Sequence, residues 1–361
     1  MAEDKSDFAL CRNKEFADDI RKGVSVLAKE RIRKITIKDV AREAGVSIST
    51  VSNALNNVNV LNPDTKEKVL EVARRLHYTP NLNGRNLKAN ATGVLGLFLG
   101  AIRGPYYGEL SDSIYRACQE SGYELEIFLS SEPSHIIANI MGHRVDGAII
   151  LNSAIKEEQA QILKEQGIPT VYIDRILIGE KSSSVVFDSR KGGQEAAKFL
   201  LELGHKKFMY MEGAVDNYDN AERRNGFFEV LKKAGIVVDD DYILRGDFER
   251  KASYDSVTEF LDSGKPLPDA IFASNDLSAV GVVEALRDGG VKVPEQVSVI
   301  GCDDIEITRL VTPSITTIRT FFEKQGIIAV EQLIRMIKGE EGKLITLNGR
   351  IIPRDSTTAK D

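Results

Sequence analysis

The sequence is poor in the residues that build disulfide frameworks and metal sites. Its 361 residues include only three cysteines and four histidines. Cys11, Cys118 and Cys302 are far apart and odd in number, and the histidines show no ligand spacing to one another or to cysteine. This pattern fits neither a disulfide scaffold nor a metal knuckle. We therefore expect reduced thiols, no metal and no cofactor.

Long apolar runs are also lacking. No stretch approaches the roughly 18–20 apolar residues that a membrane span needs. The first residues, MAEDKSDFALCRNK, do not contain the apolar core of a secretory signal. The chain carries neither a GxGxxG nor a GxxxxGK[ST] motif, so nucleotide-dependent chemistry has no motif behind it. We expect a cytoplasmic protein without a membrane partner.

The charge is unevenly distributed along the chain. The whole chain has a net charge of −6, yet residues 31–90 carry 11 Lys and Arg against 5 Asp and Glu. This segment is therefore at +6, which leaves the remaining residues at −12. A basic stretch is by itself more often a solvated surface. Attached to a larger acidic body, it is typical of a small nucleic-acid-binding module. The length suggests two or three folding units.

Residues 35–56, ITIKDVAREAGVSISTVSNALN, predict a helix-turn-helix. Val40 and Ala44 recur at helical spacing, and Gly45 can take the left-handed conformation of a turn. Ser47 is placed to cap a second helix. Small residues where the helices cross would allow the close approach that this motif needs.

A third helix is predicted directly after the motif. Asn62 is its N-cap, and Pro63 occupies its first turn. The apolar positions continue to Leu76. The three helices would form a compact bundle.

The motif DVAREAGVSISTVSNALN, followed by HYTPNLNGRNLK, resembles the lactose-repressor and galactose-repressor family of bacterial regulators. The similarity extends from about Ile35 to the C-terminus. It implies a sequence-specific DNA-binding transcriptional regulator, a repressor of carbohydrate-metabolism genes, controlled by a small molecule, which we expect to be a sugar or a sugar phosphate. It also implies that the second helix lies in the major groove, with base-reading positions at Ile48, Ser49, Ser52 and Asn53, and with DNA-backbone contacts at Thr36, Ser47, Thr50 and Asn56.

Residues 81–93 are short and polar, as in a linker. The resemblance implies a hinge helix that folds on DNA, with Leu87 inserted into the minor groove and Lys88 close to it. Gly84 stands where relatives usually have alanine, which should weaken the free helix by about 1 kcal/mol. We therefore predict an unusually ligand-sensitive hinge.

Beyond Thr92, apolar strands alternate with amphipathic helices, as parallel α/β folds require. The fold class is thus an all-α helix-turn-helix domain followed by an α/β domain, which the resemblance implies is two-lobed and periplasmic-binding-protein-like. The predicted strands are 94–100, 123–130, 145–152, 169–174, 183–188, 206–213, 242–248, 269–274 and 297–304. The predicted helices are 106–122, 157–167, 190–204, 220–235, 253–264 and 276–290.

These patterns suggest the following domain boundaries. Residues 1–34 form an extension of unknown role. Its apolar residues at helical spacing allow an amphipathic helix, and a disordered extension or a start codon placed too early is an equal alternative. The DNA-binding domain is 35–80, the hinge 81–93, and the effector-binding and dimerisation domain 94–361. Lobe 1 covers about 94–187 and 320–350, and lobe 2 about 188–319 with the C-terminal tail. The resemblance implies three crossovers between the lobes, which we expect near Asp188, near Thr320 and in the tail at 344–352.

Ligands of open α/β sheets bind at the carboxyl ends of the strands. The strand ends supply Asp174, Asn275 and Asp303, and the start of a helix supplies Arg223. The resemblance makes each an effector-contact position, and their chemistry suits a polyol. For the neighbouring carboxylates we favour a structural role as helix caps or loop ion pairs; these are Asp276 and Asp304.

Aromatic residues and the crossover add weaker candidates. Tyr106 and Tyr107 match an aromatic that packs on the ligand in relatives, although a core role for one of them is equally plausible. Thr320 and Phe322 come from the crossover. Cys302 is expected only to pack.

Several functional alternatives stay open at this point. A purine-responsive regulator, or a global carbon-catabolite regulator with a phosphoprotein partner, would share the architecture. A transport-type sugar-binding protein would share only the two lobes. An enzyme would need a nucleophile with its base or paired carboxylates, and no such set is evident. Because one recognition helix reads one half-site, we expect a homodimer on a pseudo-palindromic operator, with either an inducer or a corepressor as effector.

Overall fold

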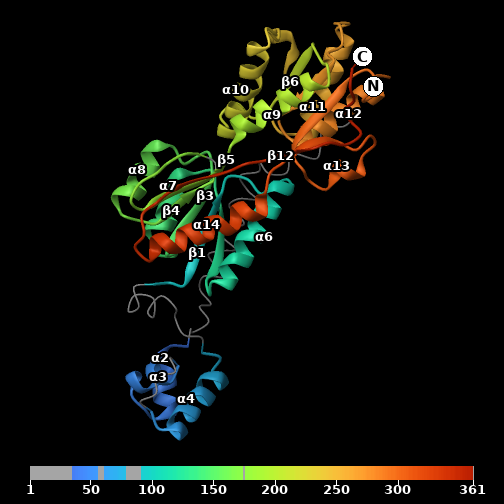
Figure 1. The fold of residues 1–361 in the computed structure, drawn as a ribbon. Coiled ribbons are helices and arrows are strands. Elements are labelled where there is room, and N and C mark those ends of the chain that lie inside the picture. Colours follow the sequence, from blue (N-terminus) through green and yellow to red (C-terminus); the bar gives the residue numbers. More distant parts are fainter. Residues whose placement is uncertain (1–34, 56–60, 79–90, 174, 361) are drawn as a thin grey trace, which may run out of the picture. The chain divides into compact units, whose positions relative to one another are not determined.

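The structure, a computed structural model, describes residues 35–55, 61–78, 91–173 and 175–360. The chain divides into two compact units, residues 1–90 and 91–361, whose elements are labelled in Figure 1. Some predictions lie outside the described residues. These are the predictions for residues 1–34, Asn56, Gly84, Leu87, Lys88 and Asp174.

The first unit contains the predicted three helices, α2 (Ile37–Ala44), α3 (Ile48–Leu55) and α4 (Pro63–Arg75). The Asn62 side chain accepts the Asp64 backbone N–H at 2.9 Å, so this asparagine caps α4 as predicted. Small and branched apolar residues from all three helices form one core. Its buried members are Val40, Ala41, Ala44, Val51, Ala54, Val69, Val72 and Ala73.

Local contacts explain why α2 and α3 begin and end where they do. The Thr36 backbone N–H and hydroxyl both donate to the Asp39 carboxylate, at 3.0 and 2.7 Å. Gly45 ends α2 with a φ of 67°, the predicted left-handed conformation. The Ser47 hydroxyl accepts the Thr50 backbone N–H at 3.1 Å and thereby caps α3. Such caps stabilise a helix by about 1 kcal/mol each.

The second unit contains two six-stranded sheets. The first has the order β11-β5-β4-β3-β1-β2, and all its strands are parallel. The second has the order β12-β10-β9-β8-β6-β7, with β12 antiparallel to β10. The strands are β1 (Val94–Leu99), β2 (Glu124–Leu129), β3 (Gly147–Leu151), β4 (Thr170–Tyr172), β5 (Ser182–Phe187), β6 (Phe208–Glu212), β7 (Ile243–Arg245), β8 (Ala270–Ala273), β9 (Ser298–Asp303), β10 (Thr316–Arg319), β11 (Leu344–Leu347) and β12 (Arg350–Ile352).

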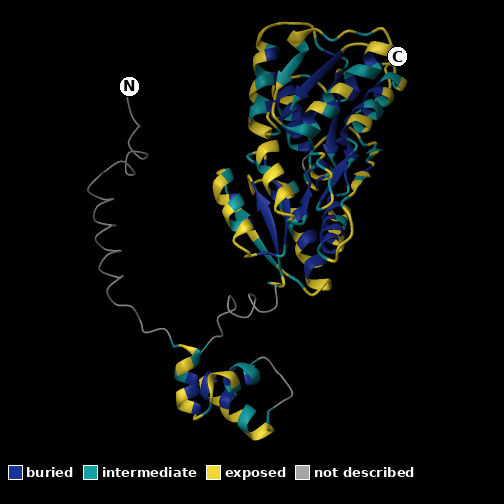
Figure 2. Cartoon of the chain, turned by 90° about the vertical axis from the view of Figure 1, so that its left-hand side faces the viewer, coloured by how far each residue is buried: buried dark blue, intermediate teal, exposed yellow. Residues whose placement is uncertain are grey.

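Helices cover both faces of each sheet, and the central strands are buried (Figure 2). Helices α6 and α14 pack on one face of the first sheet, and α7 and α8 on the other. On the second sheet, α11 and α12 cover one face and α9 and α10 the other. The helices are α6 (Pro105–Glu120), α7 (Pro133–Met141), α8 (Glu157–Glu165), α9 (Ser189–Glu202), α10 (Tyr218–Lys233), α11 (Arg250–Asp262), α12 (Asp276–Asp288), the short α13 (Ile307–Leu310) and α14 (Phe322–Ile337), with a 3-10 turn at Asp240–Tyr242.

The two sheets with their helices are hereafter lobe 1, built on β1, and lobe 2, built on β6. The chain passes between them three times, between β5 and α9, between β10 and α14, and between β11 and β12. The predicted two-lobed α/β fold is therefore confirmed. Within the described ranges, no helix is long and apolar enough to cross a lipid bilayer.

Among the elements that were not predicted from the sequence are α7, β10, α13, α14 and β11. Helix α14 is amphipathic and contributes several of its apolar residues to the lobe 1 core, so its periodicity could have revealed it. Strand β10 is only four residues long and mixes threonine with isoleucine, which gives little pattern.

Candidate functional site

Helix α3 presents the predicted base-reading residues away from the bundle core. Ile48 is 45% exposed although it is apolar, and Ser49 is also exposed. Ser52 and Asn53 are half-buried, whereas Val51 and Ala54 on the same helix are fully inside. An exposed isoleucine on a short helix with such a polar face suits contact with another surface, such as a thymine methyl group.

The predicted DNA-backbone residues that the structure describes, Thr36, Ser47 and Thr50, lie at the starts of α2 and α3, and their hydroxyls already have partners. The Ser47 hydroxyl lies 2.7 Å from that of Ser49 and 2.8 Å from that of Thr50. The Thr36 hydroxyl donates to Asp39. A phosphate at these positions would therefore exchange an existing hydrogen bond of the side chain or use backbone N–H groups.

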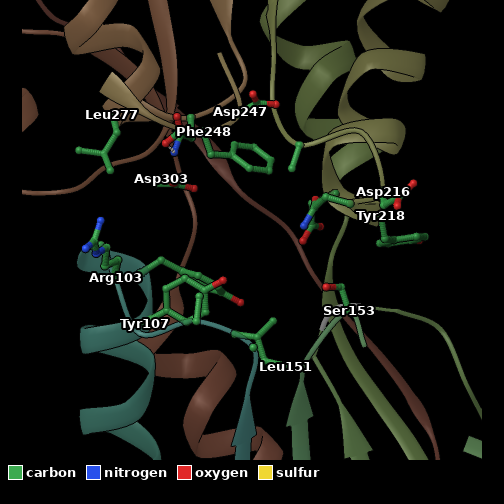
Figure 3. Close-up of a pocket in the computed structure, with 18 of the residues that line it drawn as sticks. Arg103, Tyr107, Leu151, Ser153, Asp216, Tyr218, Asp247, Phe248, Leu277 and Asp303 are labelled. Atoms are coloured by element: carbon green, nitrogen blue, oxygen red, sulfur yellow. Dashed lines mark hydrogen bonds between the residues drawn. The ribbon is translucent and has the colours of Figure 1, made fainter. Parts of the chain in front are cut away.

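A cavity of about 1170 Å³ lies between the lobes, at the carboxyl ends of the strands (Figure 3). It brings together seven of the eight candidate effector-binding residues. The seven are Tyr106, Tyr107, Arg223, Asn275, Asp303, Thr320 and Phe322. The eighth, Asp174, lies outside the described residues.

Asp303 and Arg223 form the polar centre on the lobe 2 side. Arg223 is only 5% exposed, and its guanidinium donates to the Ser274 carbonyl and, at 3.5 Å, to the Ser189 hydroxyl. Its Nε has no hydrogen-bond partner among the described residues. Asp303 has a φ of 130°, an unusual backbone conformation for a residue other than glycine. Burial and then the nearby Asp276 raise the pKa of Asp303 well above its ordinary value, which Arg223 opposes.

Asn275 has a structural role in addition to its place in the cavity. Its side-chain oxygen caps α12 by accepting the Ser278 backbone N–H at 2.9 Å. Its side-chain nitrogen donates to the Phe248 carbonyl at 3.1 Å. One amide hydrogen and one oxygen lone pair therefore remain for a ligand. The cap of α12 is thus Asn275 and not Asp276, for which the sequence favoured a role as helix cap or in a loop ion pair.

The two carboxylates for which a structural role was favoured do have structural partners. Asp276 is fully buried and accepts hydrogen bonds from the Ile305 backbone N–H at 3.0 Å and the Thr317 hydroxyl at 2.6 Å. It is thus neither a cap nor an ion pair. Asp304 does form loop ion pairs, as expected, and its partners are Arg309, Arg319 and Arg354. Burial raises the pKa of Asp304, but the hydrogen bonds and charges of Arg354 and Arg319 outweigh it and hold that pKa below its ordinary value.

Aromatic rings enter the cavity from both lobes. The rings of Tyr106 and Phe322 lie 4.7 Å apart between centroids, and those of Tyr106 and Tyr107 lie 5.4 Å apart. Tyr106 thus packs between two other rings, while Tyr107 points into the cavity from lobe 1 (Figure 3). Opposite it, Phe248 reaches in from lobe 2.

Phe248 is a lining residue that sequence reasoning missed. It follows β7 and, like the preceding Asp247, has a positive φ, at 63° and 50°. Its ring also packs against Gly213, where an added Cβ would lie 2.3 Å from the ring. Its position after the carboxyl end of a strand could have identified it as a lining residue. Seven charged residues that line the cavity were also not predicted from the sequence. They are Arg103, Lys156, Arg175, Asp216, Asp219, Asp247 and Glu249.

A helix-turn-helix unit joined to a two-lobed α/β unit with a polar cavity defines an effector-controlled DNA-binding regulator. The comparisons with known proteins agree. The family described as bacterial regulatory proteins, lacI family, matches residues 36–81, and the periplasmic binding protein-like domain matches residues 183–357. The HTH-type transcriptional repressor PurR of Histophilus somni is 31% identical over 328 residues, 89% of this chain and 98% of that protein. The ribose operon repressor of Escherichia coli is 34% identical over 309 residues, 84% and 93% of the two chains.

Solved structures give the same picture. A complex of the transcriptional regulator CelR with cellobiose has a TM-score of 0.68 at 28% identity, covering 89% of this chain and 99% of that one. The lac repressor dimer bound to operator and an anti-inducer has a TM-score of 0.77 at 23% identity, covering 91% and 100%, and so shares the fold. The chain belongs to the LacI family of bacterial transcriptional regulators, and the resemblance seen in its sequence is confirmed.

Proposed function

We propose that this regulator is a repressor whose hold on its operator is controlled by a carbohydrate bound in the cavity. The observation that carries the proposal is the convergence of the Asp303 carboxylate, the buried Arg223 guanidinium and the Asn275 amide on one cavity. Carboxylates and guanidinium groups hold adjacent hydroxyls with paired hydrogen bonds, and an amide both donates and accepts. The similarity to a ribose operon repressor and to CelR, solved with cellobiose, supports the same class of effector.

On DNA, we propose that α3 lies in the major groove and that its outer residues read the bases. Asn53 would pair with adenine, the serines would bond several bases, and Ile48 would pack on a thymine methyl group. Thr36, Ser47, Thr50 and Asn56 would fix the register through phosphates. The inward-facing side of α3 packs in the bundle core, so the outer face is the one available for DNA.

We further propose a cytoplasmic homodimer on a pseudo-palindromic operator, with residues 81–93 as the hinge and Leu87, Lys88 and Gly84 in or near the minor groove. Two-fold dimers match palindromes because each subunit reads one half-site. The effector would act by favouring one lobe arrangement over another, a coupling that is typically worth 1–3 kcal/mol. The groups that meet in the cavity suit binding, so we propose no catalytic activity.

A purine base is the second candidate effector. Tyr107 and Phe248 reach into the cavity from opposite lobes, and an aromatic ring on each side suits a flat aromatic ligand (Figure 3). The similarity to repressors named PurR points to the same alternative. A carbohydrate is favoured because Asp303, Arg223 and Asn275 match hydroxyl groups.

A thermal-shift screen of the full chain with sugars, sugar phosphates and purines tests this proposal. A ligand present at 100 times its Kd stabilises the folded state by about 2.7 kcal/mol. A hit should also change the affinity for operator DNA, measured by fluorescence anisotropy. A purine hit without any carbohydrate hit would contradict the carbohydrate effector.

Variants assign the response to the cavity. Asp303→Asn keeps the shape and tolerates the positive φ, so it should remove the ligand response and leave operator binding intact. Arg223→Ala should do the same, although the buried guanidinium also supports the fold. Asp255→Asn changes an exposed carboxylate on α11 and serves as the matched control. An undiminished response in Asp303→Asn would move the effector site elsewhere.

A further inference from the structure

The charged side chains around the cavity are segregated by lobe. Lobe 1 contributes three cations, and none of its described lining residues is an aspartate or glutamate. Lobe 2 contributes one cation, the buried Arg223, and five carboxylates. The lobe 1 cations are Arg103, Lys156 and Arg175, and the lobe 2 carboxylates are Asp216, Asp219, Asp247, Glu249 and Asp303.

The positive wall includes the start of a long helix. Helix α6 begins at the cavity, and its N-cap residue, Gly104, provides no side-chain hydrogen bond. No acidic residue lies in its first turn. A helix N-terminus carries roughly half a positive charge and attracts anions. Arg103, just before this helix, is exposed, forms no ion pair with another described residue, and stands at the lobe 1 edge of the cavity (Figure 3).

The N-terminal ends of α10 and α12, which begin at the lobe 2 wall, already have capping side chains and acidic residues. Asn217 caps α10, and Asp219 lies in its first turn. Asn275 caps α12, and Asp276 lies in its first turn. An anionic group on this side would meet capped helix ends and the side chains of Asp216, Asp219, Asp247 and Glu249, beside Asp303, whose pKa burial raises.

The lobe 2 wall nevertheless has hydrogen-bonding capacity for a neutral group. Arg223 is buried, lines the cavity and leaves its Nε without a partner among the described residues. Asp303 and Asp219 are close enough to interact electrostatically with its charge. A hydroxyl group can accept from the guanidinium and donate to a carboxylate at the same time. The lobe 1 wall therefore favours an anionic group of a ligand, and the lobe 2 wall favours its hydroxyl groups.

We propose that the effector is an anionic carbohydrate, with its hydroxyls on lobe 2 and its phosphate or carboxylate on lobe 1 beside Arg103 and the start of α6. This rests on the proposed function, because it specifies which carbohydrates the cavity takes. The cavity volume of about 1170 Å³ leaves ample room for a sugar and its charged group. The ligand would also separate the two oppositely charged walls.

Calorimetric titration of the full chain with matched ligands tests the inference. The probes are glucose, glucose 6-phosphate and glucuronate, ribose and ribose 5-phosphate, and inorganic phosphate alone. We expect at least one anionic sugar to bind about tenfold or more tightly than its neutral parent, because a charged hydrogen bond is worth at least that factor. Its affinity should fall when salt is raised from low to high concentration.

Variants at the lobe 1 wall separate the charge effect from a general loss of binding. Arg103→Ala should remove the advantage of the anionic sugar and leave the neutral parent unchanged, whereas Arg103→Lys should restore part of it. Arg287→Ala, an exposed arginine on α12, is the control. An unchanged ratio of affinities in Arg103→Ala would overturn the inference.

Each remaining outcome has a defined meaning. A neutral sugar that binds as tightly as its anionic forms, through Asp303, would overturn this inference and leave the carbohydrate effector standing. A response to purines alone would overturn both. Inorganic phosphate that reproduces the whole response would overturn the assignment of hydroxyl groups to lobe 2.

Discussion

Asp276 should make the stability of the second unit depend on pH in a direction opposite to that of most carboxylates. Its side chain is 0% exposed, and burial raises its pKa to about 7, above the ordinary value of 3.8. The folded state therefore holds its proton more tightly than the unfolded state. The stabilisation is complete below about pH 4 and is lost as the pH rises through about 7.

The magnitude follows from the same values. At about 1.4 kcal/mol per pH unit, the difference between 3.8 and about 7 corresponds to about 4 kcal/mol in total. Most of it, on the order of 2–3 kcal/mol, would be lost between pH 5 and pH 8. The neighbouring Asp303, whose pKa is also raised by burial, titrates with it, so the slope belongs to the pair.

Urea unfolding followed by circular dichroism at pH 5 and pH 8 measures this slope. Asp276→Asn should lower stability at pH 5, because the amide cannot reproduce both accepted hydrogen bonds, and should flatten the pH dependence. Asp255→Asn, an exposed carboxylate on α11, should keep the wild-type slope. The reasoning is refuted if Asp276→Asn loses stability equally at both pH values and keeps the wild-type slope.

Three further predictions concern glycines and the recognition helix. In Gly226→Ala the new methyl group would lie 1.9 Å from the Arg190 carbonyl oxygen, so the free energy of unfolding, measured by chemical denaturation, should fall by about 1–3 kcal/mol. Gly108→Ala adds its methyl group in open space and should leave that free energy unchanged or raise it. Gly84→Ala should tighten operator binding in a titration, and an unchanged Kd would remove the idea of a weakened hinge. Asn53→Ala should cost about 1–3 kcal/mol at one base pair of the operator, which binding to single-base operator variants measures; a uniform loss across all variants would exclude base reading.

The helical part of the sequence is the easier one to predict. Caps and turns have local signatures, so Gly45, Ser47 and Asn62 identify helix boundaries from sequence alone. The strands of the α/β unit are equally clear because buried parallel strands are continuous apolar runs. Strand β10 was not predicted, since four residues of mixed character carry no such pattern.

The cavity is harder to predict than the fold. Strand ends indicate Asp303 and Asn275, but the sequence does not reveal that the Asn275 amide also caps a helix. Phe248 and Arg103 sit on loops, whose direction depends on backbone conformations that no local pattern encodes. The segregation of charge between the walls is a property of the assembled lobes, because the residues that produce it are scattered from Arg103 to Asp303.

The threefold passage of the chain between the lobes has a consequence for synthesis on the ribosome. Neither lobe can be completed from a continuous stretch, because lobe 1 waits for α14 and β11 and lobe 2 for β12. The buried Ser356, which bonds the backbone of β9, comes later still. The helix-turn-helix unit has all its core residues near the N-terminus and emerges hundreds of residues earlier. A nascent chain therefore carries a finished DNA-binding unit long before the part that senses the effector can fold, and a chain cut before α14 would leave both lobes incomplete.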